Sequence, residues 1–346
     1  MKILLAGGGT LGSVSPLIAI WQSLKNKQAL DATLFVGTKN GPEQFFLKNY
    51  DLSFVSLPLV KFRRYFSLQN ILDIFKFFLS LIQSFFILKK FKPDVILSAG
   101  GFTAVPLIWI SIFFKVKVVF YQLDLKPGLA NKLCQKRANL IFTAFKETVK
   151  KFPLSKTNWA GSVIRQECQS TKNEKESSNI PSIMLLGGSS GAKFFNNLVI
   201  KSLRELTQKY FIIHITGKDK KPKLELNNYV SYELLTTDLF EKIAQADLII
   251  SRAGLATLME LSHLEKAVIL IPLPNSAQTA NAQYFCDKNA AYCLQQKDLT
   301  ADDLIQKINK IFADKDLLNN LRKNIKNIFP AQGEEKIAQA IIELCK

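Results

Sequence analysis

The sequence predicts an α/β protein with two doubly wound, Rossmann-like domains that face each other across a cleft. An apolar strand followed by a glycine-rich turn opens the chain at Lys2–Gly12 and occurs again at Ser182–Gly191. An aspartate, an apolar strand and a small-residue turn occur at Asp94–Gly100 and again at Asp247–Gly254. Doubly wound parallel sheets bind ligands beyond the carboxyl ends of their strands, so we expect these four turns to line the cleft.

Length and composition agree with a two-domain intracellular protein. The 346 residues are enough for two full cores, and no run of 18 uncharged apolar residues predicts a transmembrane helix. The first apolar strand is too short for a signal peptide. Five scattered cysteines without a CxxC motif predict reduced thiols in a cytosol. With only two histidines, His214 and His263, and no Asp-x-Asp at a strand end, we expect no metal and no cofactor.

The positive charge lies almost entirely in the first half. The net charge is +18, and residues 1–165 hold 23 Lys and Arg against 7 Asp and Glu, whereas residues 166–346 hold 23 against 21. A basic lobe indicates an anionic partner: nucleic acid, an acidic membrane surface or a phosphorylated substrate. Because its basic residues alternate with Phe and Leu, we expect no nucleic acid.

Apolar runs and turn residues place the elements of the first lobe. Helices are expected from Pro16 to Lys25, where proline suits a first turn, and onward from Gly41 and Pro127. Strands are expected at Lys2–Ala6, Ala32–Gly37, within Asp94–Ser98, and at Lys117–Gln122, Asn139–Thr143 and Thr157–Ala160.

The segment Lys61–Pro93 is unusual because its centre, Ile74–Leu88, is apolar nearly all round and basic residues bracket it. One interpretation is a crossover helix buried in the core. The other is an apolar wedge that sits in a bilayer interface, with Lys and Arg at headgroup level and each charge worth about 1 kcal/mol near an anionic leaflet. The sequence leaves both interpretations open.

Composition also suggests the domain boundaries. Residues 166–182 are polar and read as a linker between an N-terminal acceptor- and membrane-binding domain, 1–165, and a C-terminal nucleotide-sugar domain, 183–329. Residues 301–346 predict two or three amphipathic helices broken at Pro330, and we expect the last segment, 330–346, to pack back on the N-terminal domain.

The stretch Asp247–Leu261 carries the clearest chemistry. It reads as a strand, a small-residue turn at Ser251–Gly254, and a helix with Glu260 in its second turn. Such a turn aims free N–H groups and the positive end of the helix dipole at a phosphate. A carboxylate further along the helix can accept hydrogen bonds from sugar hydroxyls. The alternative is a βα unit that merely packs.

Several motifs together resemble the family-28 glycosyltransferases of the GT-B fold. The most specific is Ser251–Glu260, and the resemblance covers nearly the whole chain. The other matching segments are Gly7–Thr10, Asp94–Gly101 with Pro106, Gly161–Arg165, Gly187–Ala192, Ile271–Pro272 and Gln278–Ala282.

The resemblance implies an inverting transfer of GlcNAc from UDP-GlcNAc to the muramyl sugar of undecaprenyl-pyrophosphoryl-MurNAc-pentapeptide, which converts lipid I to lipid II in peptidoglycan synthesis. The partners would be UDP-GlcNAc, this polyprenyl-diphosphate-linked muramyl peptide and an anionic membrane surface. The protein would be peripheral, on the cytoplasmic face of the cell membrane. Two alternatives are a related glycolipid synthase with another lipid acceptor and a catalytically weak relative that binds the nucleotide sugar.

The resemblance also implies site residues. Glu260 would bind the ribose, Gln278 the GlcNAc hydroxyls, and Thr236 would lie beside the uracil. Arg165 would add charge near the donor, and Thr10, Leu11 and Gly12 would border the reacting sugar and the acceptor diphosphate. The UDP diphosphate would be held by Ser189, Gly191, Leu255, Ala256 and Thr257.

The sequence departs from the family pattern on the acceptor side. Ser13 stands where the first loop usually ends in His, Gln122–Asp124 replaces the usual Glu-Gln-Asn, and Ala277 replaces a His. We list Ser13 and Asp124 as catalytic candidates, with Asp124 also near the donor. Ser13 cannot take a proton at neutral pH without a base behind it, so Asp124 is the predicted general base. The alternative is that Asp124 only caps the helix after Pro127.

Overall fold

A computed structural model describes residues 1–58, 68–172, 180–188, 193–235 and 238–346, with backbone alone for 68–74. The chain divides into two compact units. The first unit contains Met1–Arg165 and Pro330–Lys346, and the second contains Gln166–Phe329.

The first unit is built on a parallel sheet of seven strands within the described residues, in the order β3-β2-β1-β4-β5-β6-β7. The order reverses between β1 and β4, which is the switch point of a doubly wound sheet. The predicted doubly wound parallel sheet is therefore confirmed for this unit. The strands are β1 (Lys2–Ala6), β2 (Ala32–Thr38), β3 (Ser53–Leu57), β4 (Val95–Ser98), β5 (Lys117–Gln122), β6 (Leu140–Thr143) and β7 (Thr157–Trp159).

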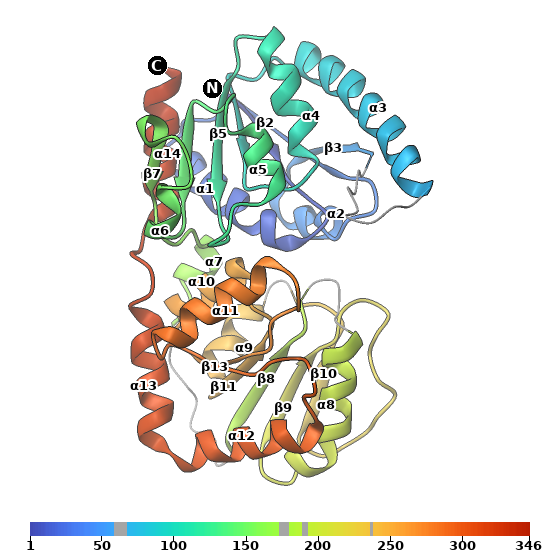
Figure 1. The fold of residues 1–346 in the computed structure, drawn as a ribbon, viewed down its shortest axis with the longest axis vertical. Coiled ribbons are helices and arrows are strands. Elements are labelled where there is room, and N and C mark those ends of the chain that lie inside the picture. Colours follow the sequence, from blue (N-terminus) through green and yellow to red (C-terminus); the bar gives the residue numbers. More distant parts are fainter. Residues whose placement is uncertain (59–67, 173–179, 189–192, 236–237) are drawn as a thin grey trace. The chain divides into compact units, whose positions relative to one another are not determined.

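Helices cover this sheet, and the C-terminal helix is one of them. Although α14 ends the chain, it packs beside α1, near its beginning (Figure 1). The helices are α1 (Ser15–Asn26), α2 (Glu43–Leu47), α3 (Leu68–Phe91), α4 (Ala104–Ile110), α5 (Leu129–Cys134), α6 (Lys146–Val149) and α14 (Gly333–Cys345), with single 3-10 turns η1 (Leu11–Ser13), η2 (Lys48–Tyr50), η3 (Ser111–Phe113) and η4 (Leu154–Lys156). Central strands such as β1 are buried on both faces, and for this reason Ile3–Ala6 is a continuous apolar run.

The second unit repeats this plan with six parallel strands within the described residues, ordered β10-β9-β8-β11-β12-β13. Its switch point lies between β8 and β11, so the second predicted doubly wound sheet is also confirmed. The strands are β8 (Ser182–Leu186), β9 (Phe211–Ile215), β10 (Tyr229–Tyr232), β11 (Leu248–Ser251), β12 (Ala267–Leu270) and β13 (Tyr292–Cys293).

Seven helices of the second unit flank its sheet within the described residues. They are α7 (Gln166–Gln169), α8 (Lys193–Leu206), α9 (Leu239–Gln245), α10 (Leu255–His263), α11 (Ala277–Asp287), α12 (Ala301–Ala313) and α13 (Lys315–Lys326). Helix α7 lies in the segment that composition suggests is a linker. Its buried Cys168 donates a hydrogen bond to the backbone carbonyl of Glu260, so the start of this segment packs under α10.

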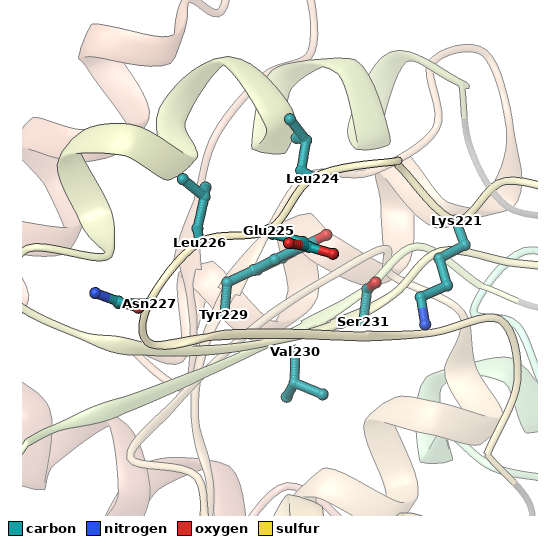
Figure 2. Close-up of a pocket in the computed structure, with 8 residues that line it drawn as sticks. All are labelled: Lys221, Leu224, Glu225, Leu226, Asn227, Tyr229, Val230 and Ser231. Atoms are coloured by element: carbon teal, nitrogen blue, oxygen red, sulfur yellow. The ribbon is translucent and has the colours of Figure 1, made fainter.

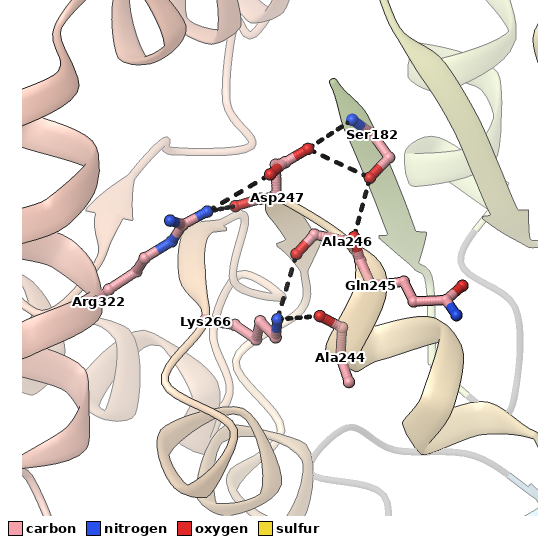
Figure 3. Close-up of polar contacts among 7 residues, drawn as sticks. All are labelled: Ser182, Ala244, Gln245, Ala246, Asp247, Lys266 and Arg322. Atoms are coloured by element: carbon pink, nitrogen blue, oxygen red, sulfur yellow. Dashed lines mark hydrogen bonds and ion pairs between the residues drawn. The ribbon is translucent and has the colours of Figure 1, made fainter. Parts of the chain in front are cut away.

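The repeat seen in the sequence extends to individual hydrogen bonds. In the first unit, the Asp94 carboxylate accepts from the backbone N–H of Lys2 at 2.7 Å. In the second, the Asp247 carboxylate accepts from the N–H of Ser182 at 2.8 Å and from its hydroxyl at 3.3 Å (Figure 3). Each aspartate precedes the strand beyond the switch point and locks that strand to the first strand of its sheet.

Two cations complete the cluster around Asp247. Arg322 of α13 lies 3.6 Å from the carboxylate and donates to the Asp247 carbonyl at 3.1 Å. The buried Lys266 donates to the carbonyls of Ala244 and Ala246 at the end of α9, where the helix dipole favours a cation (Figure 3). The contacts at the amino ends of these strands are therefore structural, whereas the predicted site lies at the carboxyl ends.

One expectation about the cysteines is wrong. The structure joins Cys286 of α11 to Cys293 of β13 in a disulfide with the two Cα atoms 6.2 Å apart. The sequence separation of 7 gives no motif, and only the packing of α11 on β13 brings the two thiols together. Cys134, Cys168 and Cys345 form no disulfide, and burial raises the pKa of Cys134 to about 12.

Within the described part of the chain, no helix combines the length and the apolar character needed to cross a bilayer.

Candidate active site

The clearest candidate site lies at the carboxyl edge of the second sheet, where β11 turns into α10. Gly254 is the N-cap of α10, and a Cβ added there would meet no described atom within 4 Å. Leu255, Ala256 and Thr257 form the first turn, whose N–H groups have no partner within the helix itself. The turn therefore places backbone donors and the positive end of a nine-residue helix beside Gly254, where the described residues leave room.

Buried polar side chains hold this turn in place. The Arg252 guanidinium donates to the Ile271 carbonyl at 2.9 Å, the Ser251 hydroxyl donates to the Arg252 carbonyl at 2.9 Å, and Asn281 of α11 donates to the Ala253 carbonyl at 3.3 Å. Arg252 and Asn281 are 7% and 0% exposed. Sequence reasoning assigned neither residue a role, because both act on a turn through contacts made only in the folded chain.

Glu260 lies in the second turn of α10, as predicted, and is 5% exposed. A carboxylate at this depth in a protein needs polar partners. Its backbone is fixed by Cys168, as described above. The position one and a half turns beyond the open N-terminus suits contact with a group linked to a phosphate held there.

Gln278 lies in the first turn of α11 and is also preorganised. Ser276 caps this helix by accepting from the Gln278 N–H at 3.2 Å, and Gln278 Oε1 accepts from the Leu273 N–H at 3.0 Å. With Oε1 engaged, the Nε2 amino group is the part of this carboxamide suited to a sugar hydroxyl.

The turn after β8 lies beside a chain of hydrogen bonds among Asn196, His214 and Tyr229, which we call the buried relay. Asn196 of α8 donates from Nδ2 to the Thr216 carbonyl at 2.8 Å, so its Oδ1 is the acceptor 3.3 Å from His214 Nε2. His214 Nδ1 then accepts from the Tyr229 hydroxyl at 3.1 Å. Burial lowers the pKa of His214 to about 4, which keeps the ring neutral in this tautomer.

The buried relay packs closely against the glycine turn, since a Cβ added to Gly187 would lie only 3.3 Å from Asn196 Oδ1. Gly188 follows with φ +87°, a left-handed conformation that glycine adopts without strain. The predicted diphosphate contacts Ser189 and Gly191 and the predicted uracil contact Thr236 lie outside the described residues.

In the first unit, the turns after β1 and β4 meet at the switch point. A Cβ on Gly101 would lie 3.5 Å from the Gly8 carbonyl, and both glycines have positive φ. Thr10, Leu11 and Gly12 follow this meeting point, and Leu11 begins the turn η1. The structure thus brings together two of the glycine turns that the sequence places on the acceptor side.

Asp124 lies half-buried in the loop after β5, at the same edge of the sheet. The buried Gln122 organises this loop, since its Nε2 donates to the Asp124 carbonyl at 2.7 Å and its Oε1 accepts from Asn131 at 2.7 Å. The N-cap of the following helix α5 is Gly128. Asp124 is therefore not the N-cap residue of α5, and its role as a general base stays a prediction.

Ser13 is engaged within its own turn. Its Oγ accepts from the Gly8 N–H at 3.2 Å and lies 3.4 Å from the Thr10 carbonyl. Arg165 is 5% exposed, and its guanidinium carbon lies 5.1 Å from the centre of the Phe46 ring on α2. These positions leave the predicted roles of both residues as predictions.

A second feature of the first unit is an exposed apolar face on α3. Phe75, Phe78, Leu79, Ile82 and Phe86 follow helical spacing, and each is more than half exposed. The opposite face, towards the unit, carries Ser80 and Ser84, whose hydroxyls bond to carbonyls of their own helix. For these residues the buried-helix interpretation is wrong.

Residues of α4 and η3 extend this face, and we call the combined surface the α3 face. The exposed Trp109, Ile112 and Phe113 come from α4 and η3, and α4 packs on α3, with the Trp109 ring 5.6 Å from that of Phe77. Phe77 itself is partly buried against the core of the unit. Exposed lysines accompany the apolar residues at positions Lys76, Lys89, Lys90 and Lys115.

A shallow cavity of about 380 Å³ lies elsewhere, between β10 and the loop before it (Figure 2). Its lining includes Lys221, Glu225, Tyr229 and Ser231. It lies along the sheet-edge strand and contains none of the predicted site residues. Among the described residues, no group of three or more His, Cys, Asp and Glu side chains gathers as metal ligands would.

Comparisons with known proteins match both parts of the chain to one family. The N-terminal domain model of glycosyltransferase family 28 matches residues 3–143, and the C-terminal domain model of the same family matches residues 182–340. A relative from Borrelia garinii subsp. bavariensis is 35% identical, over 99% of this chain and 96% of its own length. One from Staphylococcus aureus is 32% identical, over 93% of this chain and 94% of its own.

Both relatives are named UDP-N-acetylglucosamine–N-acetylmuramyl-(pentapeptide) pyrophosphoryl-undecaprenol N-acetylglucosamine transferase. The crystal structure of MurG from Acinetobacter baumannii has the same fold, with a TM-score of 0.73 and 21% identity over 99% of each chain. The match of both domain models and the two nearly full-length relatives show that this chain belongs to glycosyltransferase family 28.

Proposed function

We propose that this chain is an inverting transferase that moves GlcNAc from UDP-GlcNAc to the muramyl sugar of a polyprenyl-diphosphate-linked muramyl peptide. The product is the disaccharide lipid of peptidoglycan synthesis, lipid II. The relatives that bear the name of this activity support the proposal over nearly the whole chain. The observation that carries it is the open turn before α10, with Glu260 following on the same helix.

The chemistry needs a held donor and a place for the acceptor proton. The first turn of α10, at Leu255–Thr257, takes the diphosphate, Glu260 accepts from the ribose hydroxyls and Gln278 donates to the GlcNAc. In a single displacement the acceptor oxygen bonds to the anomeric carbon as the bond to the diphosphate breaks. UDP leaves with the electron pair, and Asp124 takes the hydroxyl proton. The helix N-terminus stabilises the departing charge, so we propose that no metal is required.

The test is transfer by the purified full chain. With labelled UDP-GlcNAc and lipid I, we expect a labelled disaccharide lipid to form in the presence of a chelator. Diacylglycerol in place of lipid I should give no product. Product formation with diacylglycerol and none with lipid I would establish a glycolipid synthase instead. UDP binding without transfer to either acceptor would establish a nucleotide-sugar-binding relative, and both results contradict the proposal.

We also propose that the α3 face attaches the protein to the cytoplasmic face of the membrane, where its lipid-linked acceptor resides. An exposed apolar helix face flanked by lysines has the composition of an interfacial helix. Attachment then combines burial of Phe and Ile side chains with attraction of lysines to anionic lipid, and added salt weakens only the second part.

Vesicle sedimentation tests this attachment. The protein should pellet with vesicles of phosphatidylglycerol and phosphatidylcholine and be partly released by salt. Replacing Phe75, Phe78, Ile82 and Phe86 with Ser should abolish pelleting and leave the melting temperature unchanged, because these side chains are exposed. Leu154→Ser is the matched control, since Leu154 is 70% exposed outside this face. Undiminished pelleting of the fourfold variant would contradict the assignment.

A further inference from the structure

The first glycine turn uses its N–H groups inside the protein. The Gly7 N–H donates to the Val36 carbonyl at 3.2 Å, and the Gly8 N–H donates to Ser13 Oγ at 3.2 Å. The Gly9 N–H lies 3.2 Å from both carboxylate oxygens of Glu43. All three donors that could form an anion-binding nest therefore already have acceptors.

Glu43 stands out because it is a fully buried carboxylate, 0% exposed, on the short helix α2. Besides Gly9, it accepts from the Thr38 N–H at 2.6 Å and from the Thr38 hydroxyl. Burying a carboxylate is costly unless hydrogen bonds satisfy it, and here they come from two separate segments. Both carboxylate oxygens therefore have hydrogen-bond donors within the protein.

The carboxylate also fills the space beneath the turn. A Cβ on Gly8 or on Gly41 would collide with the Glu43 side chain. Gly8 has φ +154° and leads into Gly9 with φ +81°. The conformation of the turn and the position of Glu43 are therefore mutually required.

Helix α2 is anchored independently of this carboxylate. Phe46, on the same helix, is 4% exposed, and its ring centre lies 5.4 Å from that of Tyr50. The Arg165 guanidinium covers the same ring. Because these contacts keep α2 in place, a change confined to the Glu43 carboxylate alters its hydrogen bonds to the glycine turn and to Thr38 and leaves the helix where it is.

We propose that Glu43 is a positioning residue for glycosyl transfer: through Gly9 it fixes the direction in which Thr10–Gly12 leave the turn. This inference rests on the proposed function, in which that segment borders the reacting sugar. Glu43 touches no substrate. Its effect is on the geometry of the acceptor side, and the UDP-binding residues proposed above belong to the other unit.

The test compares Glu43→Gln with Thr38→Val in the full chain. Glu43→Gln keeps the shape but replaces one of the two oxygens that face the Gly9 N–H with an NH2 group, so it weakens the Gly9 contact. Thr38→Val removes one hydrogen bond to the same carboxylate and leaves Gly9 untouched. We expect kcat for lipid I to fall about 100-fold in Glu43→Gln, the loss typical of a displacement of about 1 Å. UDP affinity should stay within about twofold, since α10 and its first turn are unchanged.

Melting temperatures separate positioning from folding. Thr38→Val should lower the melting temperature while keeping kcat within about threefold of the parent, because one hydrogen bond contributes stability but not the direction of the turn. If kcat falls in both variants in step with melting temperature, or if folded Glu43→Gln keeps full turnover, the proposal is wrong. Should Glu43→Gln not fold, Glu43→Asp replaces it, and failure of both to fold assigns Glu43 to folding alone. A parent protein without transfer activity would instead contradict the proposed function.

Discussion

Replacing Glu260 with Ala should weaken UDP binding by about 1–3 kcal/mol, which is roughly 5- to 150-fold in Kd. The estimate follows from the site, because Glu260 is 5% exposed and a ribose hydroxyl that loses a charged acceptor there has little water to replace it. Alanine favours helices, and the substitution keeps the backbone carbonyl of residue 260 to which Cys168 donates, so α10 should persist. The loss should therefore appear in affinity and not in folding.

Isothermal titration calorimetry of the full chain with UDP measures this effect. Glu260→Gln keeps an acceptor oxygen without the charge and should lose less affinity than Glu260→Ala. Glu205→Ala is the control, because Glu205 is an exposed carboxylate on α8 of the same unit. It should leave Kd unchanged.

Two results would contradict a hydrogen bond between Glu260 and the ribose of UDP. If Glu260→Ala binds UDP as tightly as the parent and melts at the same temperature, Glu260 does not contact the nucleotide. If Glu205→Ala loses as much affinity, the loss is not specific to Glu260, because removing a distant negative charge should by itself slightly strengthen binding of the anionic UDP.

Three further outcomes are expected. Asp124→Asn should reduce lipid I turnover at least about 100-fold with unchanged UDP affinity; surviving activity would mean that the proton leaves by another route. Asp247→Asn should cost about 1–3 kcal/mol in urea unfolding, since one carboxylate joins Ser182 to Arg322. The lowered pKa of His214, about 4, makes the unfolded chain bind more protons than the folded one below pH 6.5. Stability should thus fall by up to about 3 kcal/mol as pH drops from 7 to 4, and urea midpoints of His214→Asn should lack this part of the slope.

The fold was predictable where the chain repeats itself. The strands β1 and β5 have the predicted bounds, and the paired patterns around Asp94 and Asp247 correspond to equivalent strands with the same hydrogen bond to the first strand. Buried parallel strands are continuous apolar runs, which are readable without tertiary information. Short edge strands such as β3 and β13 give no such run, and their pairing depends on the sheet beside them.

The site was predictable only in part, because sequence motifs report backbone turns better than the side chains that hold them. Glu260 lies in the second turn of α10, as predicted, and Gln278 in the first turn of α11. Glu43 was visible only as a residue near the start of a helix. Its partner Gly9 is 34 residues away, so its role emerges only when β2 and the first turn come together.

Helix α3 shows how composition alone can leave two answers open. Its apolar residues are nearly continuous, so they do not reveal which side faces the sheet. The structure decides this through Ser80 and Ser84, which are buried while Phe78 and Phe86 are exposed. Small side chains allow the helix to approach the unit closely, and their hydroxyls are satisfied by their own helix, so burying them costs little. The large apolar side chains of α3 then face away from the unit, where they can contact another surface.

The two glycine turns at the starts of the two units carry a more general lesson about such motifs. Gly7–Gly9 and Gly187–Gly188 follow equivalent strands and look alike in sequence. At Gly8 the space for a side chain is filled by Glu43, whereas at Gly188 no described atom lies within 4 Å of that space. Glycine is required at the first position because the protein itself approaches, and at the second because φ is +87°, a left-handed conformation that other residues adopt only with strain. A glycine-rich turn therefore indicates close approach to the backbone, and only its surroundings decide whether the approaching group is a substrate or a side chain of the same chain.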